Sequence, residues 1–175
     1  MHRLMLLRHA KSDWSKPGMP DRNRPLNARG REAAPLMAAH IASQELVPQR
    51  VLVSTATRTR ETWKLMTPFF PRKPETMFEG RLYESSPHTI LAVIKETPAG
   101  IKSLMIVGHN PGLQTLALAL IGSGNAKARE ELATKFPTAA LAVIDFAAGP
   151  WSALRPGTGR LEHFVRPRDL NGDDD

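Results

Sequence analysis

Residues 4–11 read LMLLRHAK, an apolar run of four residues that passes directly into a polar turn. The same order recurs at residues 51–58, which read VLVSTATR, and at residues 104–112, which read LMIVGHNPG. Apolar runs without alternation are typical of strands that are buried on both faces, as in parallel sheets. Because a helical pattern follows each polar turn, we predict an α/β fold.

Capping residues mark where several of the helices are expected to begin and end. One helix is predicted from about Asn27 to Ser43, with Asn27 as its cap. Another follows Ser86-Pro87, with serine at the cap and proline in the first turn. The helix after the second strand should stop before Pro68, and the helix after the third strand should run from near Leu113 to Gly122.

The C-terminal part of the sequence is expected to complete the sheet. A late strand is predicted at residues 141–144, followed by a final pair of strands around Trp151 and Phe164. A length of 175 residues fits one domain, which we place at residues 1–168. Residues 169–175 are expected to be a frayed acidic tail.

Composition excludes several classes of protein and of chemistry. No apolar run approaches the roughly 20 residues that span a bilayer. The first nine residues contain an apolar run that is too short for the core of a signal peptide. A cytoplasmic protein without a membrane partner is therefore expected. The absence of cysteine excludes disulfides, zinc–thiolate sites and a cysteine-based phosphatase mechanism. No His, Asp or Glu cluster has metal-ligand spacing, so neither a metal nor another cofactor is expected.

The balance of charge suggests an anionic partner. Lys and Arg number 24 against 17 for Asp and Glu, which gives a formal charge of +7. Phosphate groups, acidic proteins and nucleic acids would all suit this charge, although many basic residues are simply solvated. Nucleic acid is disfavoured because the chain has one Tyr and no interleaving of basic and aromatic residues.

The residues that could take part in a reaction lie at the ends of the three predicted strands. Arg8 and His9 follow the first strand, Arg58 follows the second, and His109 follows the third. Because the carboxyl ends of parallel strands meet at one edge of a sheet, these side chains should converge. Arginine matches phosphate oxygens, and neutral histidine can attack phosphorus. Each feature alone fits a surface turn, but their convergence predicts a phosphoryl site.

These segments resemble the histidine phosphatase superfamily. The resemblance rests on Arg8-His9-Ala10, on residues 54–62 and on residues 107–111. Further segments resemble its small SixA-type phosphohistidine phosphatases, namely Arg24-Pro25-Leu26 with Arg29-Gly30, Leu82-Tyr83 and residues 136–142. The resemblance runs from Leu4 to about Pro167 and implies a phosphoglycerate mutase-like fold, a three-layer α/β/α sandwich with a mostly parallel central sheet.

The resemblance also implies roles for four residues. His9 attacks phosphorus and becomes a transient phosphohistidine, which water then hydrolyses. Arg8 and Arg58 hold the phosphoryl oxygens, and His109 adds a further donor. Since His9 must present an unprotonated nitrogen, its other ring nitrogen should donate to a fixed acceptor such as a backbone carbonyl. The two arginines should lower the pKa of His9.

The general acid and the remaining contacts to substrate are less sharply defined. Glu84 is the candidate acid, with Glu79 and Asp13 as alternatives, while Lys11 and Ser12 are candidates for binding phosphate. A poor acid favours a phosphoramidate, because imidazole is a far better leaving group than an alkoxide.

Three functions therefore stay open at this point. The first is a phosphatase of protein phosphohistidine, the second is a phosphatase of small phosphate esters, and the third is a non-catalytic phosphoprotein-binding module. Arg22 and Arg24, in the loop from Pro17 to Pro25, are expected to border the mouth of the site and to attract acidic substrates.

Overall fold

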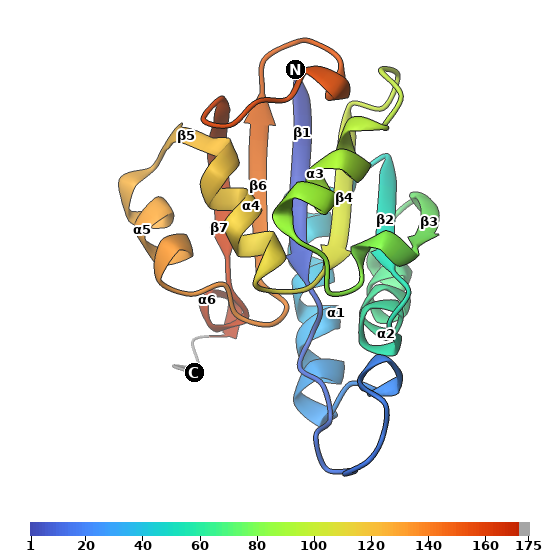
Figure 1. Cartoon of the computed structure of the whole chain (residues 1–175). Coiled ribbons are helices and arrows are strands. Elements are labelled where there is room, and N and C mark those ends of the chain that lie inside the picture. Colours follow the sequence, from blue (N-terminus) through green and yellow to red (C-terminus); the bar gives the residue numbers. More distant parts are fainter. Residues whose placement is uncertain (172–175) are drawn as a thin grey trace.

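A computed structural model describes residues 1–171 as a three-layer α/β fold, in which one mixed sheet lies between two layers of helices (Figure 1). Within the described residues the sheet has seven strands in the order β3-β2-β4-β1-β6-β7-β5. The strands are β1 (His2–Arg8), β2 (Arg50–Ser54), β3 (Glu75–Glu79), β4 (Ser103–Gly108), β5 (Ile121–Gly124), β6 (Leu141–Phe146) and β7 (Gly159–Val165). β6 pairs antiparallel with both of its neighbours, and every other pairing is parallel.

Helices cover both faces of this sheet. They are α1 (Ala28–Ser43), α2 (Thr57–Met66), α3 (Pro87–Lys95), α4 (Gly112–Leu120), α5 (Ala126–Thr134) and α6 (Pro167–Asn171). Short 3-10 turns occur at η1 (Asp21–Asn23), η2 (Thr67–Phe69), η3 (Gly80–Leu82) and η4 (Trp151–Ala153). Side chains of α3, α4 and α5 pack in one hydrophobic cluster, and those of α1 and α2 pack in another on the opposite face.

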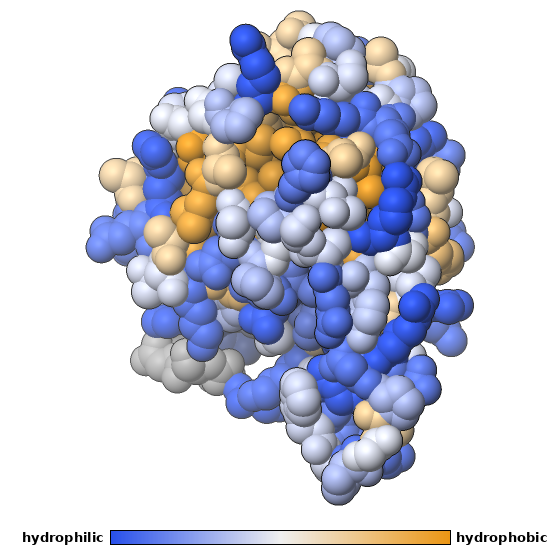
Figure 2. Space-filling view, in the orientation of Figure 1, coloured by the Kyte–Doolittle hydropathy of each residue, from blue (hydrophilic) through white to orange (hydrophobic). Residues whose placement is uncertain are grey.

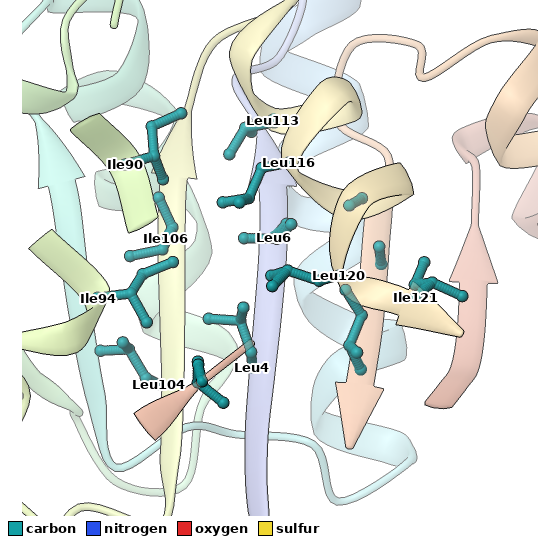
Figure 3. Close-up of a cluster of buried hydrophobic side chains, with 14 of the residues drawn as sticks. Leu4, Leu6, Ile90, Ile94, Leu104, Ile106, Leu113, Leu116, Leu120 and Ile121 are labelled. Carbon is teal, nitrogen blue, oxygen red and sulfur yellow. The ribbon is translucent and has the colours of Figure 1, made fainter. Parts of the chain in front are cut away.

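The apolar run of β1 feeds both clusters, which explains why it does not alternate with polar residues. Leu4 and Leu6 pack among α3 and α4, as Figure 3 shows, whereas Met5 and Leu7 pack toward α1 and α2. All four side chains are almost completely buried. Burial of each stabilises the fold by about 1.5–3 kcal/mol, so the centre of the sheet is strongly held.

The predicted helix caps are present. The Asn27 side chain accepts a hydrogen bond from the backbone N–H of Gly30, and Ser86 accepts one from Thr89. Gly30 also lets α1 begin against the turn after β1, because a Cβ atom there would lie 2.2 Å from the carbonyl oxygen of Lys11. The turn after β1, which carries His9 and Lys11, therefore packs closely against the start of α1.

Other predictions were incomplete or wrong. Residues 75–79, 121–124 and 126–134 form β3, β5 and α5, which were not predicted. Of the final pair of strands predicted around Trp151 and Phe164, only the second is present, because Phe164 lies in β7 and Trp151 lies in the turn η4. Trp151 is buried there, and its Nε1 donates to the carbonyl of Ile101 at 2.6 Å.

The first three residues of the predicted frayed tail are helical. Residues 169–171 are part of α6, and Asp169 accepts a hydrogen bond from the backbone N–H of Arg166, which holds the start of this helix. Residues 172–175 of the predicted tail lie outside the described residues. Among residues 1–171, no helix is both long enough and apolar enough to cross a membrane.

Candidate active site

Four predicted residues meet at the carboxyl end of the sheet. Arg8 ends β1 and His9 follows it, Arg58 lies in the first turn of α2, and His109 follows β4. Because β1 and β4 are neighbours in register, with Arg8 beside Gly108, the two histidines come side by side, with ring centroids 5.3 Å apart. All four residues line one cavity of about 1120 Å³. The strand topology thus brings together side chains from three distant parts of the chain.

His9 has the hydrogen bond that a nucleophile at this position needs. Its Nδ1 lies 2.6 Å from the carbonyl oxygen of Ala10. A carbonyl only accepts, so Nδ1 carries the proton and Nε2 is left with a free lone pair. Burial lowers the pKa of His9 to about 3; the bond to Ala10 opposes this, while His109, Arg8 and Arg58 lower it further. Burial therefore outweighs the arginines, which were the expected cause.

His109 is oriented by a buried hydroxyl. Its Nε2 lies 2.8 Å from Oγ of Ser54, which is completely buried and also lies 3.5 Å from the backbone N–H of Ala56. A hydroxyl can donate to Nε2 or accept from it, and the ring proton lies on Nδ1 in the tautomer in which Ser54 donates. Burial lowers the pKa of His109 to about 3, and the charge of Arg58 adds to this effect. The ring of His109 is thus neutral at neutral pH rather than an imidazolium.

Three buried side-chain nitrogens in this cluster have no partner among the described residues. The Nε of Arg8, the Nε of Arg58 and the Nδ1 of His109 are buried and make no hydrogen bond within residues 1–171. Burying such groups unpaired costs about 1–3 kcal/mol each, and more when they are charged. The positive charges of Arg8 and Arg58 at the wall of this cavity favour an anion, and a phosphoryl group with several acceptor oxygens suits arginine donors.

Asp21 is a site residue that sequence reasoning missed. It lies in η1 and joins three side chains: its Oδ2 accepts from Tyr83 at 2.5 Å and from Arg58 at 3.1 Å, and its Oδ1 accepts from Arg24 at 2.8 Å. Burial raises the pKa of this carboxyl, but the bonds from Tyr83 and Arg24 and the charge of Arg58 hold it well below its ordinary value. Asp21 is therefore an ionised anchor for Arg58.

The one sequence signal for Asp21 is its setting. It is an acid in a segment that otherwise carries arginines, Arg22 and Arg24. Through Asp21 the predicted loop from Pro17 to Pro25 is docked against Arg58 in this structure, because the backbone carbonyl of Asp21 also accepts from Arg58 at 3.0 Å.

The weaker candidates divide into two groups. Lys11, Ser12 and Glu84 line the same cavity as His9, with Lys11 and Glu84 exposed and Ser12 buried. The hydroxyl of Ser12 accepts from Nη1 of Arg24 at 2.7 Å. Asp13 and Glu79 are not among the lining residues.

The carboxylates of Asp13 and Glu79 instead make contacts outside the cavity. Asp13 caps the backbone N–H of Ser15 at 2.7 Å, and Glu79 forms an ion pair with Arg81. Their positions weigh against both as general acids. Within the part of the chain that the structure describes, no group of three or more His, Asp or Glu side chains could hold a metal ion.

Charged side chains extend the cavity beyond the histidines. Toward α5 and α6 its lining includes Lys127, Glu130, Glu131, Lys135, Arg166 and Arg168. Figure 2 shows hydrophilic side chains gathered over this end of the molecule, whereas the hydrophobic surface in that view lies over α3 and α4. The cavity is therefore a polar cleft that is wider than a phosphate group requires.

Comparison with known proteins agrees with this geometry. Residues 4–86 match the model of the histidine phosphatase superfamily (branch 1). An uncharacterised protein of Mycobacterium leprae is 36% identical over 167 residues, which cover 93% of this chain and all of that protein.

Two solved structures are similar over nearly the whole chain. The proposed phosphohistidine phosphatase SixA of Agrobacterium tumefaciens has a TM-score of 0.81 and 32% identity, covering 95% of this chain and 98% of that one. The corresponding protein of Nakamurella multipartitia has a TM-score of 0.80 and 26% identity, covering 95% and 96%. The predicted SixA-type, phosphoglycerate mutase-like architecture is confirmed.

Proposed function

The chain belongs to the histidine phosphatase superfamily, and from this membership we propose that it is a phosphatase that forms a phosphoenzyme on His9. The observation that carries the proposal is the bond from Nδ1 of His9 to the carbonyl of Ala10. This bond leaves Nε2 with a free lone pair beside Arg8, Arg58 and His109, and burial keeps the ring neutral at neutral pH.

In the first step, the lone pair of His9 Nε2 forms a bond to phosphorus while the bond from phosphorus to the leaving group breaks. The leaving group takes that electron pair, and the positive charge on the ring is stabilised through Nδ1–H and Ala10. Water then attacks phosphorus and breaks the N–P bond, which releases phosphate and restores His9. Arg8, Arg58 and His109 donate to the phosphoryl oxygens throughout, where charge spreads in the transition state.

We propose protein phosphohistidine as the substrate. Its imidazole leaving group needs little protonation, which suits a site where Asp21 is ionised and Glu84 is exposed. The cavity, of about 1120 Å³, extends to residues of α5 and α6 and so offers room for more of a substrate than its phosphoryl group. The similar Agrobacterium protein is itself a proposed phosphohistidine phosphatase. Because His9 and the two arginines supply the nucleophile and the charge, we propose that the reaction needs no metal.

A phosphatase of small phosphate esters is the second candidate. It is favoured by the presence of Glu84 on the cavity wall, where a carboxylic acid could protonate an alkoxide. The two candidates differ in leaving group, so relative kcat/KM on a phosphohistidine protein and on a phosphate monoester separates them.

The test is a rapid-quench assay with a protein substrate that carries labelled phosphohistidine, with excess chelator present throughout. We expect wild type to trap label that survives alkali and is lost in acid, and His9→Ala to trap none and to lose at least about a thousandfold in kcat/KM. His88→Ala, at an exposed position in α3, is the matched control and should behave as wild type.

Two results would contradict the proposal. Turnover without trapped label would exclude the covalent mechanism. Binding of the phosphoprotein with neither label nor turnover would instead identify a non-catalytic phosphoprotein-binding module.

A further inference from the structure

Trp14 is exposed at the wall of the catalytic cavity. Its side chain is 76% exposed, whereas the other two tryptophans, Trp63 and Trp151, are 3% and 1% exposed. It lies in the loop after β1, five residues beyond His9, and lines the same cavity. A large aromatic side chain left in water at a ligand-binding cleft is a common feature of recognition surfaces.

A buried arginine holds Trp14 in place. The guanidinium of Arg24 lies 3.5 Å from the centre of the indole rings, and Arg24 itself is 7% exposed. The Nε and Nη2 of Arg24 donate to Asp21, and its Nη1 donates to Ser12. These hydrogen bonds hold the guanidinium in its position against the indole. A cation stacked on an aromatic face is attracted by the ring quadrupole. One face of the indole is therefore covered, and much of the rest is open.

The same network reaches the phosphoryl site. The carboxylate of Asp21 binds Arg24 through Oδ1 and Arg58 through Oδ2. The orientation of Trp14 is thus set by the group that also orients Arg58. An ordered ring loses little rotamer freedom on binding, so more of its contact energy contributes to affinity.

We propose that Trp14 is a substrate-recognition residue whose open indole face binds the apolar part of the polypeptide beside the phosphorylated histidine. The inference rests on the proposed function. Arg8, Arg58 and His109 can recognise the phosphoryl group alone, so discrimination of a phosphoprotein from a small phosphorylated molecule needs contacts outside that cluster. Trp14 is an exposed large apolar side chain in the lining of this cavity, whereas Leu36, which also lines it, is only partly exposed.

The first test compares two substrates that share the phosphoryl group. We would measure kcat/KM on a phosphohistidine peptide and on phosphoramidate, which has no polypeptide. In Trp14→Ala the ratio of the two values should fall about tenfold, while Trp14→Phe should restore most of it. Phe69→Ala, at an exposed residue of η2 outside the cavity lining, should leave the ratio unchanged.

The second test is independent of turnover. Because Trp63 and Trp151 are buried, a peptide with a non-hydrolysable phosphohistidine analogue should shift the emission of Trp14, and Trp14→Phe should lose that signal. An unchanged ratio in Trp14→Ala would overturn the inference while leaving the phosphatase intact. Equal binding of the analogue peptide to wild type and Trp14→Ala would overturn the inference as well. If wild type hydrolyses neither substrate, the proposed function itself fails.

Discussion

Replacement of His9 by glutamine should flatten the acid dependence of stability. Burial lowers the pKa of His9 from 6.5 to about 3 in the folded protein. Between these values the unfolded chain binds the proton and the folded chain does not, so acid favours unfolding. The stability that depends on a neutral His9 is therefore fully present above pH 6.5 and is lost progressively as the pH falls toward about 3.

The magnitude follows from proton linkage. One proton bound only by the unfolded state changes the free energy of unfolding by about 1.4 kcal/mol per pH unit. Because the unfolded histidine is already half protonated at pH 6.5, wild type should lose about 2.3 kcal/mol more than His9→Gln between pH 6.5 and about pH 4.5. His109 has a similarly low pKa and contributes its own loss in both proteins.

Urea unfolding followed by circular dichroism, at a series of pH values, measures this difference. Phosphate and sulfate must be left out of the buffers, because an anion bound to the native site would add stability of its own. His88→Gln, an exposed position, serves as the control and should follow wild type. Parallel curves for wild type and His9→Gln would refute the reasoning, as would an NMR titration of His9 centred near its ordinary pKa.

Two further substitutions test the supports of the site. Asp21→Asn should lower kcat/KM about tenfold, because Arg58 loses its ionised anchor. The same substitution should lower the pKa of Tyr83, the chain's one tyrosine, because burial and the bond to Asp21 raise this pKa in wild type. Ultraviolet titration of the tyrosinate checks the second effect, and an unmoved midpoint would contradict the contact. Gly30→Ala should destabilise the fold by about 2–3 kcal/mol, since its Cβ would overlap a backbone carbonyl after β1; Gly100→Ala, in open space, should cost far less in urea unfolding.

The parts of the fold that could be predicted are those with strong local signals. β1, β2 and β4 have continuous apolar runs because both faces of each strand are covered, and α1 and α3 have capping residues. Weak signals explain the omissions. β3 is largely exposed at the edge of the sheet, and β5 is a four-residue strand with two glycines.

Prediction of the site followed the same division. Arg8, His9, Arg58 and His109 follow strand ends, whose position in an α/β sheet is set by topology. Asp21 depends on the path of an irregular loop across the sheet edge, and no periodicity in the sequence encodes that path. For the same reason, Asp13 and Glu79 could not be separated from Glu84 before their contacts were known.

The central position of β1 has a consequence for synthesis of the chain. Leu4 pairs with Leu104 on one side and with Ile144 on the other, so the strand that is made first waits for partners that are made a hundred and a hundred and forty residues later. At 5–20 residues per second, roughly 5–20 seconds pass before β4 is made and roughly 7–30 seconds before β6 is made, so β1 stays without its full set of neighbours for that time. His9, the proposed nucleophile, follows that strand directly. Its backbone carbonyl accepts from the N–H of Ala139, so a nascent chain that ends before Ala139 lacks this contact and presents an apolar segment of the kind that chaperones bind.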